Sequence, residues 1–578
     1  MSYLFNVFLC SFINLFVLCL ESFSSSFCVR LIFLSCYPDA NLPHYIRAIQ
    51  IPVNKQAGDA IPVSEFMPYA DGVTPSETSK YEKRGIAVKV PQWLPENCIG
   101  CNKCALVCPH AAIRPFLLNA EEEAAKPASF VTKEAKGKGF EGLTFRMQVD
   151  PLDCQGCGAC ANACPAKEKA LVMELLDTQM PEQENWDHAL TLSPKANPMD
   201  KFTVRGSQFE RPLYEFSGAC AGCGEAPYMK LMSQLFGDRM FVTSATGCAY
   251  VVGSSTPSFP YAVNEKGHGP ANSNSLFEDN AEYALGMKLS IDQMRRQMAV
   301  HAEAVVAATS DAALKSAIEA WLAEGDIGDK TRALSEAVVA ALDATSETSD
   351  DIAFMKANKD VLPKKSVWMY GGDGWAYDIG FGGLDHILAS GADVNILVVD
   401  TEVYSNTGGQ ASKASNVGQV AQFAAAGKAI GKKDLAAIAM SYGYVYVAQI
   451  AMGADANQTM KALSEAEAYP GPSIVIAYAP CEMHGVKGGM ANSQVEMKRA
   501  VEAGYWQMFR YNPALKVEGK NPFILDSKEP TGDYQAFLAS EVRYARLAQA
   551  FPERAKELFA KSEENAKAKY ARLAEMAK

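Results

Sequence analysis

The sequence has 578 residues, which is enough for roughly three or four domains. Hydrophobic residues make up 48% and charged residues 21%, as in ordinary globular proteins, and the net charge of −12 argues against a general nucleic-acid-binding protein, whose surface would be basic. The 16 cysteines are clustered along a long chain, unlike those of a small secreted disulfide scaffold, so we expect a reducing compartment: the cytoplasm or, alternatively, an anaerobic organelle.

The first 40 residues contain no motif to which we assign a catalytic or binding role. Tyr3–Leu20 is uncharged and rich in Phe and Leu, and its length is borderline for a membrane span. The segment has neither the positive start nor the small-residue cleavage site of a signal peptide. Three interpretations of residues 1–40 stay open: an artefact of the start site or gene model, a membrane anchor, and a targeting segment. Residues 41–95 are punctuated by Pro and Gly, and we interpret them as a linker or the tail of a preceding domain.

Residues 96–195 contain two copies of C-x2-C-x2-C-x3-C-P, a pattern typical of a ferredoxin-like domain with two [4Fe–4S] clusters. The copies are Cys98, Cys101, Cys104 and Cys108 with Pro109, and Cys154, Cys157, Cys160 and Cys164 with Pro165. Because the fourth cysteine of each copy binds the other cluster, the predicted ligand sets are Cys98, Cys101, Cys104 and Cys164, and Cys108, Cys154, Cys157 and Cys160. A pair of structural zinc sites is the alternative, but each would need four ligands in two separate C-x2-C pairs rather than three closely spaced cysteines and a fourth. We expect the insertion at 115–148 to form a solvated loop or hairpin.

Residues 200–530 have the pattern of an α/β domain, in which short apolar runs alternate with helical stretches such as Asp378–Ala389. The predicted parallel strands are Met240–Ser244, Ser366–Tyr370, Asn395–Val399, Tyr444–Gln449 and Ser473–Tyr478. Residues 281–345 predict Ala-rich surface helices, and residues 531–578 predict a charged helical tail without a visible site. The expected fold class is an α/β domain with a mostly parallel sheet flanked by helices, preceded by a small α+β two-cluster ferredoxin-like domain.

Unusual residues follow four of the predicted strands, and ligands in open α/β sheets bind beyond the carboxyl ends of the strands. Glycines around Asp373 remove Cβ atoms, so the backbone can approach a phosphate closely. Asp373 can supply the carboxylate oxygen that Mg2+ prefers, and a Thr hydroxyl and a backbone carbonyl in 400–406 can add further oxygens. This G-D-G pattern with a later Asn-containing turn resembles the thiamine diphosphate motif; a simple Gly-rich turn is the alternative.

Four further cysteines lie beside this candidate site. Cys220 and Cys223 form a C-x2-C pair, and Cys248 and Cys481 each follow a predicted strand. Brought together, the four thiolates can hold a third [4Fe–4S] cluster. A four-thiolate zinc site and four unrelated core cysteines are the alternatives, and the ferredoxin-like pattern upstream favours the cluster.

Together these motifs resemble pyruvate:ferredoxin (flavodoxin) oxidoreductase over about residues 45–520. Besides the two ferredoxin-type runs, the residues that carry the resemblance are G-A-C-A-G-C-G-E at 218–225, A-T-G-C at 245–248, G-G-D-G-W at 371–375, D-T-E-V-Y-S-N-T-G-G-Q at 400–410 and A-P-C at 479–481.

The resemblance implies specific roles for these residues. Cys220, Cys223, Cys248 and Cys481 would hold the cluster nearest the thiamine. Asp373, the Thr401 side chain and the Val403 carbonyl would bind Mg2+. The implied thiamine diphosphate contacts are Glu225, Cys248, Gly372, Asp373, Gly374, Trp375, Thr401, Glu402, Val403, Tyr404, Ser405 and Asn406. Asn406 matches a residue next to pyruvate and is the candidate catalytic residue.

The resemblance also implies a reaction and partners. Family members of the single-chain type are about twice as long, and their amino-terminal half binds the aminopyrimidine ring and supplies the glutamate that sets its tautomer. This chain therefore resembles the carboxy-terminal half. The implied partners are pyruvate, coenzyme A, a ferredoxin or flavodoxin, and the amino-terminal half or a separate subunit, within a dimer.

The implied activity is enzymatic. It is the oxidative decarboxylation of pyruvate with coenzyme A to acetyl-CoA and CO2, with electrons leaving through three [4Fe–4S] clusters. Two alternatives stay open: another 2-oxoacid:ferredoxin oxidoreductase, and a truncated electron-transfer protein that catalyses nothing.

Overall fold

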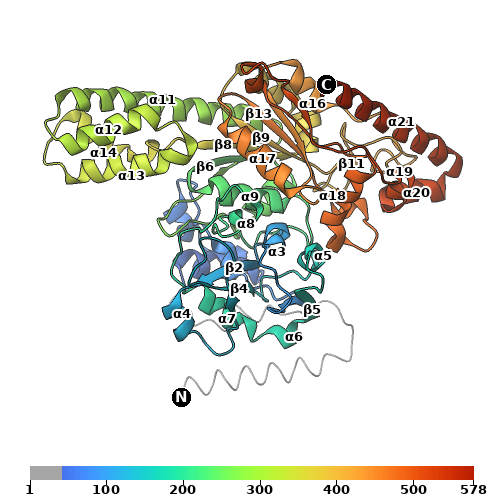
Figure 1. Cartoon of the computed structure of the whole chain (residues 1–578), viewed down its shortest axis with the longest axis horizontal. Helices are drawn as coiled ribbons and strands as arrows, with labels where there is room; N and C mark the ends of the chain where they lie inside the picture. Colours follow the sequence, from blue (N-terminus) through green and yellow to red (C-terminus); the bar gives the residue numbers. More distant parts are fainter. Residues whose placement is uncertain (1–41) are drawn as a thin grey trace.

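The computed structural model describes residues 42–578, with a large α/β sheet above a smaller ferredoxin-like unit in the view of Figure 1. The apolar segment 1–40, with its three open interpretations, lies outside the described residues. Within residues 42–578 no helix is both long enough and apolar enough to cross a membrane.

The segment interpreted as a linker, 41–95, contains short helices packed on the rest of the chain. These are η3 (Ile46–Gln50), α2 (Ile51–Asn54), η4 (Gly58–Ala60), η5 (Val63–Tyr69) and η6 (Thr78–Tyr81). Ile46 and Ile49 are buried in a small apolar cluster that includes Phe259 of the α/β domain. The Thr78 hydroxyl lies 3.0 Å from the carbonyl oxygen of Pro257. The segment therefore packs against the α/β domain along part of its length.

The ferredoxin-like unit begins a few residues before position 96. Strand β1 (Lys89–Trp93), the first of the unit, pairs antiparallel with β5 (Leu171–Leu175), the last. Helices α3 (Lys103–Val107) and α5 (Ala159–Ala163) contact each other, and each lies within one cysteine run. Helices α6 (Leu176–Gln179) and α7 (Glu182–Ala189) follow β5.

The insertion between the cysteine runs forms a small antiparallel sheet. Strand β2 (Ile113–Leu118) pairs with β4 (Thr144–Val149), and β3 (Lys133–Glu134) adds to the other side of β4. Helix α4 (Ala120–Ala125) begins at Asn119, which forms a reciprocal capping box with Glu122. The insertion thus takes the hairpin form, but the expectation that it is solvated is wrong, because its side chains at Phe130, Phe140 and Phe145 are buried.

The large sheet has eight strands within the described residues, in the order β15-β14-β12-β13-β9-β8-β6-β7. The bounds are β6 (Met240–Ser244), β7 (Ala271–Ser273), β8 (Ser366–Gly372), β9 (Asn395–Asp400), β12 (Tyr446–Ile450), β13 (Ser473–Tyr478), β14 (Phe509–Tyr511) and β15 (Phe523–Leu525). The strands from β12 to β7 in this order run parallel to one another. At one edge, β14 pairs antiparallel with β12, and β15 pairs antiparallel with β14. All five predicted strands are present, because their continuous apolar runs suit a sheet that is buried on both faces.

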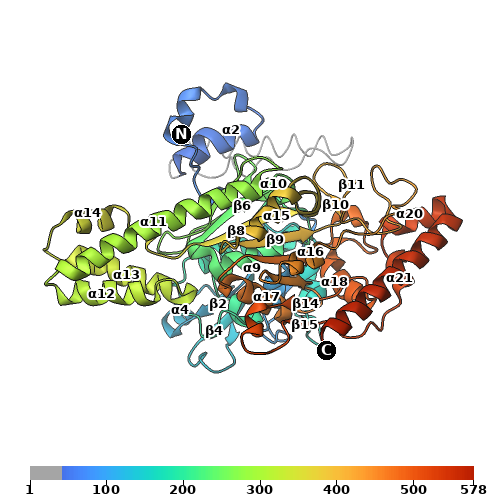
Figure 2. The same ribbon diagram turned by 90° about the horizontal axis from the view of Figure 1, so that it is seen from above.

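Helices pack around the sheet, and further helices project beyond it on both sides (Figures 1 and 2). The helices next to the sheet are α8 (Val204–Ser207), α9 (Ala226–Phe236), α10 (Cys248–Ser254), α15 (Phe381–Ser390), α16 (Leu435–Ser441), α17 (Ala456–Ala468) and α18 (Ser493–Glu502). The predicted helix at Asp378–Ala389 corresponds to the end of η9 (Gly374–Ile379) followed by α15.

Two groups of helices lie on opposite sides of the sheet (Figure 2). One is an arm of α11 (Asn280–Ala308), α12 (Ala312–Glu324), α13 (Gly328–Ala344) and α14 (Asp350–Ala357), which confirms the surface helices predicted for 281–345. The other is the tail of α19 (Tyr534–Ala539), α20 (Val542–Ala550) and α21 (Pro552–Met576). The arm has its own buried core around Trp321, whereas the tail packs against the α/β domain.

Candidate functional site

A pocket at the carboxyl ends of the parallel strands gathers most of the predicted cofactor residues. Its lining residues are Glu225, Thr246, Gly247, Cys248, Ala249, Phe277, Gly372, Asp373, Gly374, Trp375, Thr401, Val403, Tyr404, Ser405, Asn406 and Thr407. Every predicted thiamine diphosphate contact except Glu402 is among them. Parallel strands all end on the same side of a sheet, which explains how segments so distant in sequence line one pocket.

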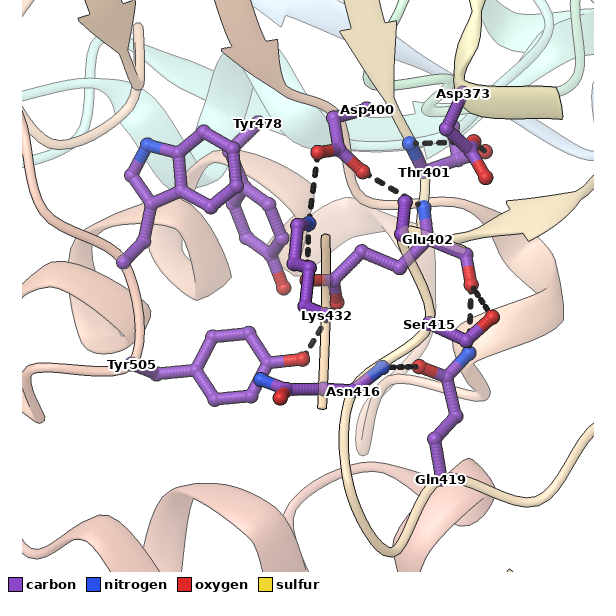
Figure 3. Close-up of polar contacts among 12 residues, drawn as sticks. Asp373, Asp400, Thr401, Glu402, Ser415, Asn416, Gln419, Lys432, Tyr478 and Tyr505 are labelled. Carbon is purple, nitrogen blue, oxygen red and sulfur yellow. Dashed lines mark hydrogen bonds and ion pairs between the residues drawn. The ribbon is translucent and has the colours of Figure 1, made fainter. Parts of the chain in front are cut away.

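Three oxygen groups meet beside this pocket. Asp373 follows β8, and Thr401 follows the neighbouring parallel strand β9. The Thr401 hydroxyl oxygen lies 3.0 Å from Asp373 Oδ1 and 3.0 Å from the carbonyl oxygen of Val403. Figure 3 shows Asp373 and Thr401 side by side. A carboxylate, a hydroxyl and a carbonyl are the hard oxygen ligands that Mg2+ prefers, so these residues fit a Mg2+ ion.

The electrostatics of Asp373 also fit a cation. The residue is 1% exposed, and burial, followed by repulsion from Asp400, raises the pKa of Asp373 to about 7. Its carboxylate accepts hydrogen bonds from the Thr401 N–H at 3.3 Å and the Ser412 hydroxyl at 2.5 Å. Because a buried carboxylate is costly without a compensating positive charge, this position favours a bound divalent cation. Ser412 has no motif that identifies it in the sequence.

The glycines around Asp373 serve aromatic packing as well as the pocket. A Cβ atom on Gly374 would lie 2.5 Å from the Tyr404 ring, and one on Gly371 would lie 2.4 Å from the Trp375 ring. Gly372 differs, because the nearest heavy atom to its added Cβ would be 3.9 Å away. Of these three glycines, Gly372 is therefore the one that leaves open space for a phosphate group.

Glu225 contributes an unpaired carboxyl oxygen to the pocket. Burial, followed by repulsion from Asp373, raises the pKa of Glu225 to about 8. Within the described residues, its Oε2 is buried and has no hydrogen-bond partner. A bound group that donates a hydrogen bond would satisfy this atom, so Glu225 fits a cofactor contact.

The four cysteines of the predicted third cluster come together at the same edge of the sheet. Cys220 and Cys223 lie in the loop before α9, Cys248 is the first residue of α10, and Cys481 follows β13. Burial raises the pKa of the Cys248 thiol, and negative charge at Glu225 and at the other three cysteines raises it further. The four thiols are thus close enough to interact, and Cys248 also lines the pocket.

The cysteines of the ferredoxin-like unit form two groups. Burial raises the pKa of several of these thiols, and most of the neighbouring thiols that add to this effect fall within one of two sets: Cys98, Cys101, Cys104 and Cys164, and Cys108, Cys154, Cys157 and Cys160. The exception is Cys104, which also acts on Cys160, so the two sets adjoin. These groups correspond to the crossed ligand sets. The twelve cysteines within residues 42–578 are all free thiols. No group of three or more His, Cys, Asp or Glu in this range could hold a single metal ion, whereas the thiolates around one cluster bind different iron atoms.

Direct contacts join the third cysteine group to the ferredoxin-like unit. The backbone N–H of Gly222 lies close enough to the Cys157 thiol to offset part of the rise that burial causes in the pKa of Cys157. Asn162 Nδ2 donates to the carbonyl oxygen of Ala491 at 3.1 Å. On α9, the buried Lys230 donates to the carbonyl oxygens of Leu106 at 2.9 Å and of Cys108 at 3.0 Å, at the end of α3. The two sites are therefore held next to each other by protein contacts.

Glu402 is the one predicted cofactor contact that the structure places elsewhere. Its side chain is 1% exposed and pairs with Lys432 and Arg543 in a buried cluster of charges. The tail residue Arg543 was not predicted to contribute to any site, because nothing in a charged helical sequence distinguishes it from its exposed neighbours.

Comparison with known families identifies both parts of the chain. Residues 97–167 match the family described as a 4Fe-4S dicluster domain, and residues 351–477 match the C-terminal TPP binding domain of thiamine pyrophosphate enzymes. Residues 36–87 match a domain of unknown function named EKR. The expected fold class is thereby confirmed: a ferredoxin-like domain precedes a thiamine diphosphate-binding α/β domain.

Curated relatives match almost the whole chain. A pyruvate-flavodoxin oxidoreductase from Enterobacter agglomerans is 56% identical over 91% of this chain and 45% of its own length. A pyruvate:ferredoxin oxidoreductase from Moorella thermoacetica is 56% identical over 92% and 46%, and a pyruvate-flavodoxin oxidoreductase from Klebsiella pneumoniae is 54% identical over 93% and 46%. The predicted resemblance to one half of these enzymes is confirmed, and the chain spans a little under half the length of these relatives.

Proposed function

We propose that this chain, a relative of the pyruvate:ferredoxin (flavodoxin) oxidoreductases, is the half of such an enzyme that binds the diphosphate of thiamine diphosphate and carries electrons away. The reaction would be the oxidative decarboxylation of pyruvate with coenzyme A to acetyl-CoA and CO2. The observation that supports this most is that a predicted cluster ligand and the predicted metal ligands line the same pocket. Cys248 lines the same pocket as Asp373 and Thr401, so a cluster ligand lies beside the residues that fit the metal of a bound diphosphate.

The residues of the pocket would have separate tasks. Thiamine diphosphate, when bound, supplies the electron sink for decarboxylation. Asp373, the Thr401 hydroxyl and the Val403 carbonyl would hold Mg2+ and thereby anchor the diphosphate. Glu225 would accept a hydrogen bond at its free Oε2, and Asn406 would contact pyruvate at the pocket mouth.

The cysteine groups would hold three [4Fe–4S] clusters. Cys220, Cys223, Cys248 and Cys481 would hold the cluster at the pocket. The proximity of the Gly222 backbone to the Cys157 thiol supports a position for the next site, in the ferredoxin-like unit, beside this cluster. A ferredoxin or flavodoxin, the carriers named for the relatives, would collect the electrons.

The proposal includes a partner and a location. Because the relatives are more than twice as long as the matched region, the aminopyrimidine-binding half would come from a further segment or a separate subunit, and the assembly would be a dimer. A cytoplasmic location agrees with twelve free thiols in the described residues.

The test is pyruvate-dependent reduction of a viologen dye by the iron-loaded chain mixed with the amino-terminal half of a relative. We expect reduction that requires pyruvate, coenzyme A, thiamine diphosphate and Mg2+. A panel of 2-oxoglutarate, branched-chain oxoacids and indolepyruvate separates the pyruvate enzyme from related 2-oxoacid oxidoreductases. Full iron content without reduction of the dye by any oxoacid would support a non-catalytic electron-transfer protein instead.

A further inference from the structure

Glu402 has an unusual backbone conformation between two residues that fit Mg2+. Its φ is +61°, in the left-handed region that non-glycine residues seldom adopt. The Ser415 hydroxyl at 2.5 Å and Gln419 Nε2 at 3.0 Å both donate to its carbonyl oxygen (Figure 3). Because Glu402 stands between Thr401 and Val403, its conformation sets the directions of the Thr401 hydroxyl and the Val403 carbonyl. Such a conformation persists only where the surroundings hold it.

The side chain of Glu402 is held by three donors. Lys432 Nζ lies 2.9 Å from Oε1, while Arg543 Nη1 at 2.7 Å and the Tyr505 hydroxyl at 2.5 Å both reach Oε2. Figure 3 shows Lys432 between Asp400 and Glu402. The side chain of Glu402 is therefore fixed in place by two cations and one hydroxyl group.

Arg543 brings the carboxy-terminal tail to this loop by two routes. The first is its contact with Glu402. In the second, Arg543 Nε donates to Glu541 at 2.6 Å, Glu541 Oε1 lies 3.6 Å from His484 Nδ1, and His484 Nε2 lies 2.7 Å from the Thr401 carbonyl oxygen. The start of α20 thus contacts the loop at successive residues.

Arg543 holds two buried carboxylates of this cluster. Its Nη1 lies 2.7 Å from Glu402 Oε2, and its Nε lies 2.6 Å from Glu541 Oε2. Loss of Arg543 would leave two buried carboxylates without their guanidinium, and a buried charge that loses its partner is strongly unfavourable.

We propose that Arg543 is a positioning residue for the Mg2+–diphosphate site. Acting through Glu402, it holds residues 401–403 in the conformation that directs the Thr401 hydroxyl and the Val403 carbonyl toward the metal ion. The inference rests on the proposed function, because it requires that these oxygens bind Mg2+. It gives the tail helix α20 a role at a site whose Glu402 lies 141 residues earlier in the chain than Arg543.

The test measures Mg2+-dependent binding of thiamine diphosphate to the full, iron-loaded chain, alone and with the amino-terminal half of a relative. Quenching of tryptophan fluorescence reports the binding. Arg543→Met should weaken binding about tenfold or more, because a charge-assisted hydrogen bond to a buried carboxylate is lost. Arg543→Lys, which keeps the charge, should retain most of the affinity. Adding Glu402→Gln to Arg543→Met should cost little more, because the two residues act as one unit.

A second readout needs no ligand. Amide hydrogen exchange at residues 401–405 should be faster in Arg543→Met than in the unmodified chain. The matched control is Arg546→Met, an exposed arginine on the same helix, which should change neither readout. Should Arg543→Met not fold, Glu402→Gln, which keeps the side-chain shape, should show the same weaker binding and faster exchange.

The outcomes separate the inference from the proposed function. If the unmodified chain binds thiamine diphosphate with Mg2+ and Arg543→Met binds it equally well, the inference is wrong and the proposed function stands. Equal losses in Arg543→Lys and Arg543→Met, or unchanged exchange at 401–405, would also overturn it. If the unmodified chain does not bind with or without the added half, the proposed function fails and the inference fails with it.

Discussion

The hydroxyl oxygen of Thr401 lies 3.0 Å from Oδ1 of Asp373, although the two residues follow different strands. Strands β8 and β9 are parallel neighbours, so their carboxyl ends deliver both side chains to one point. The Val403 carbonyl oxygen is also 3.0 Å from this hydroxyl. Three oxygen atoms of the kinds that Mg2+ prefers are therefore brought together by this chain's own residues.

Replacing Asp373 by Ala should abolish Mg2+-dependent binding of thiamine diphosphate and leave all three clusters intact. The change removes the carboxylate from the ligand set. Mutation of residues that only support a metal ligand already lowers metal affinity by about ten- to a hundredfold, so we expect the affinity for thiamine diphosphate to fall by about a hundredfold or more. Isothermal titration calorimetry measures the affinity, and iron analysis checks the clusters. Asp393→Ala is the control, because Asp393 pairs with Lys364 at 2.9 Å before β9 begins, at the opposite end of the strand. Similar affinities in both variants would show that the metal site is wrong.

Replacing Cys481 by Ser should remove or destabilise one cluster of three. Iron content should fall from roughly twelve to roughly eight atoms per chain, because three four-iron clusters become two. The remaining signals in electron paramagnetic resonance should be those of the ferredoxin-type clusters, whose ligands lie in another part of the chain. An iron content unchanged at about twelve would refute this ligand assignment.

Much of the site follows from local sequence. The cysteine spacings predict the two crossed groups in the ferredoxin-like unit, because each run folds into one tight turn and one short helix. The apolar runs predict the parallel strands, and with them the shared edge where Asp373 and Thr401 meet. These features depend on neighbours in sequence or on a general property of parallel sheets.

The support of the site does not follow from local sequence. Glu402 lies in a cofactor motif, but its positive φ turns its side chain away from the pocket and toward Arg543. Ser412 and Arg543 reach the loop only through the tertiary fold, so no spacing identifies them. The glycines illustrate the same limit: the pattern around Asp373 indicates phosphate binding, whereas Gly371 and Gly374 are required by the Trp375 and Tyr404 rings.

Replacing Gly224 by Ala should remove the third cluster without removing a ligand. An added Cβ would lie 2.5 Å from the carbonyl oxygen of Pro480, so Cys223 and Cys481, which flank these two residues, would move apart. We expect iron to fall by about four atoms per chain, as in Cys481→Ser. The control is Gly218→Ala, where nothing lies within 4 Å of the added atom. Equal iron contents in the two alanine variants would contradict the proposed close approach.

Replacing Lys83 by Met should destabilise the ferredoxin-like unit. Lys83 Nζ lies 2.6 Å from Asp150 and 2.8 Å from Asp153, and both carboxylates are buried just before Cys154. Removing the cation leaves two buried negative charges, and breaking a buried pair costs about 3–5 kcal/mol. The denaturant midpoint should fall, and iron should be lost first from the cluster that includes Cys154.

The exposed pair of Lys266 and Glu336 is a matched control for Lys83→Met. Their nitrogen–oxygen distance is 2.8 Å, but the side chains are 62% and 40% exposed. Because water and salt screen such a pair, Lys266→Met should cost about 1 kcal/mol or less. Combining Lys83→Met with Asp153→Asn should recover part of the lost stability, because one uncompensated charge is removed. If the Lys83 and Lys266 variants unfold at the same midpoint, the buried ion pair does not stabilise the ferredoxin-like unit.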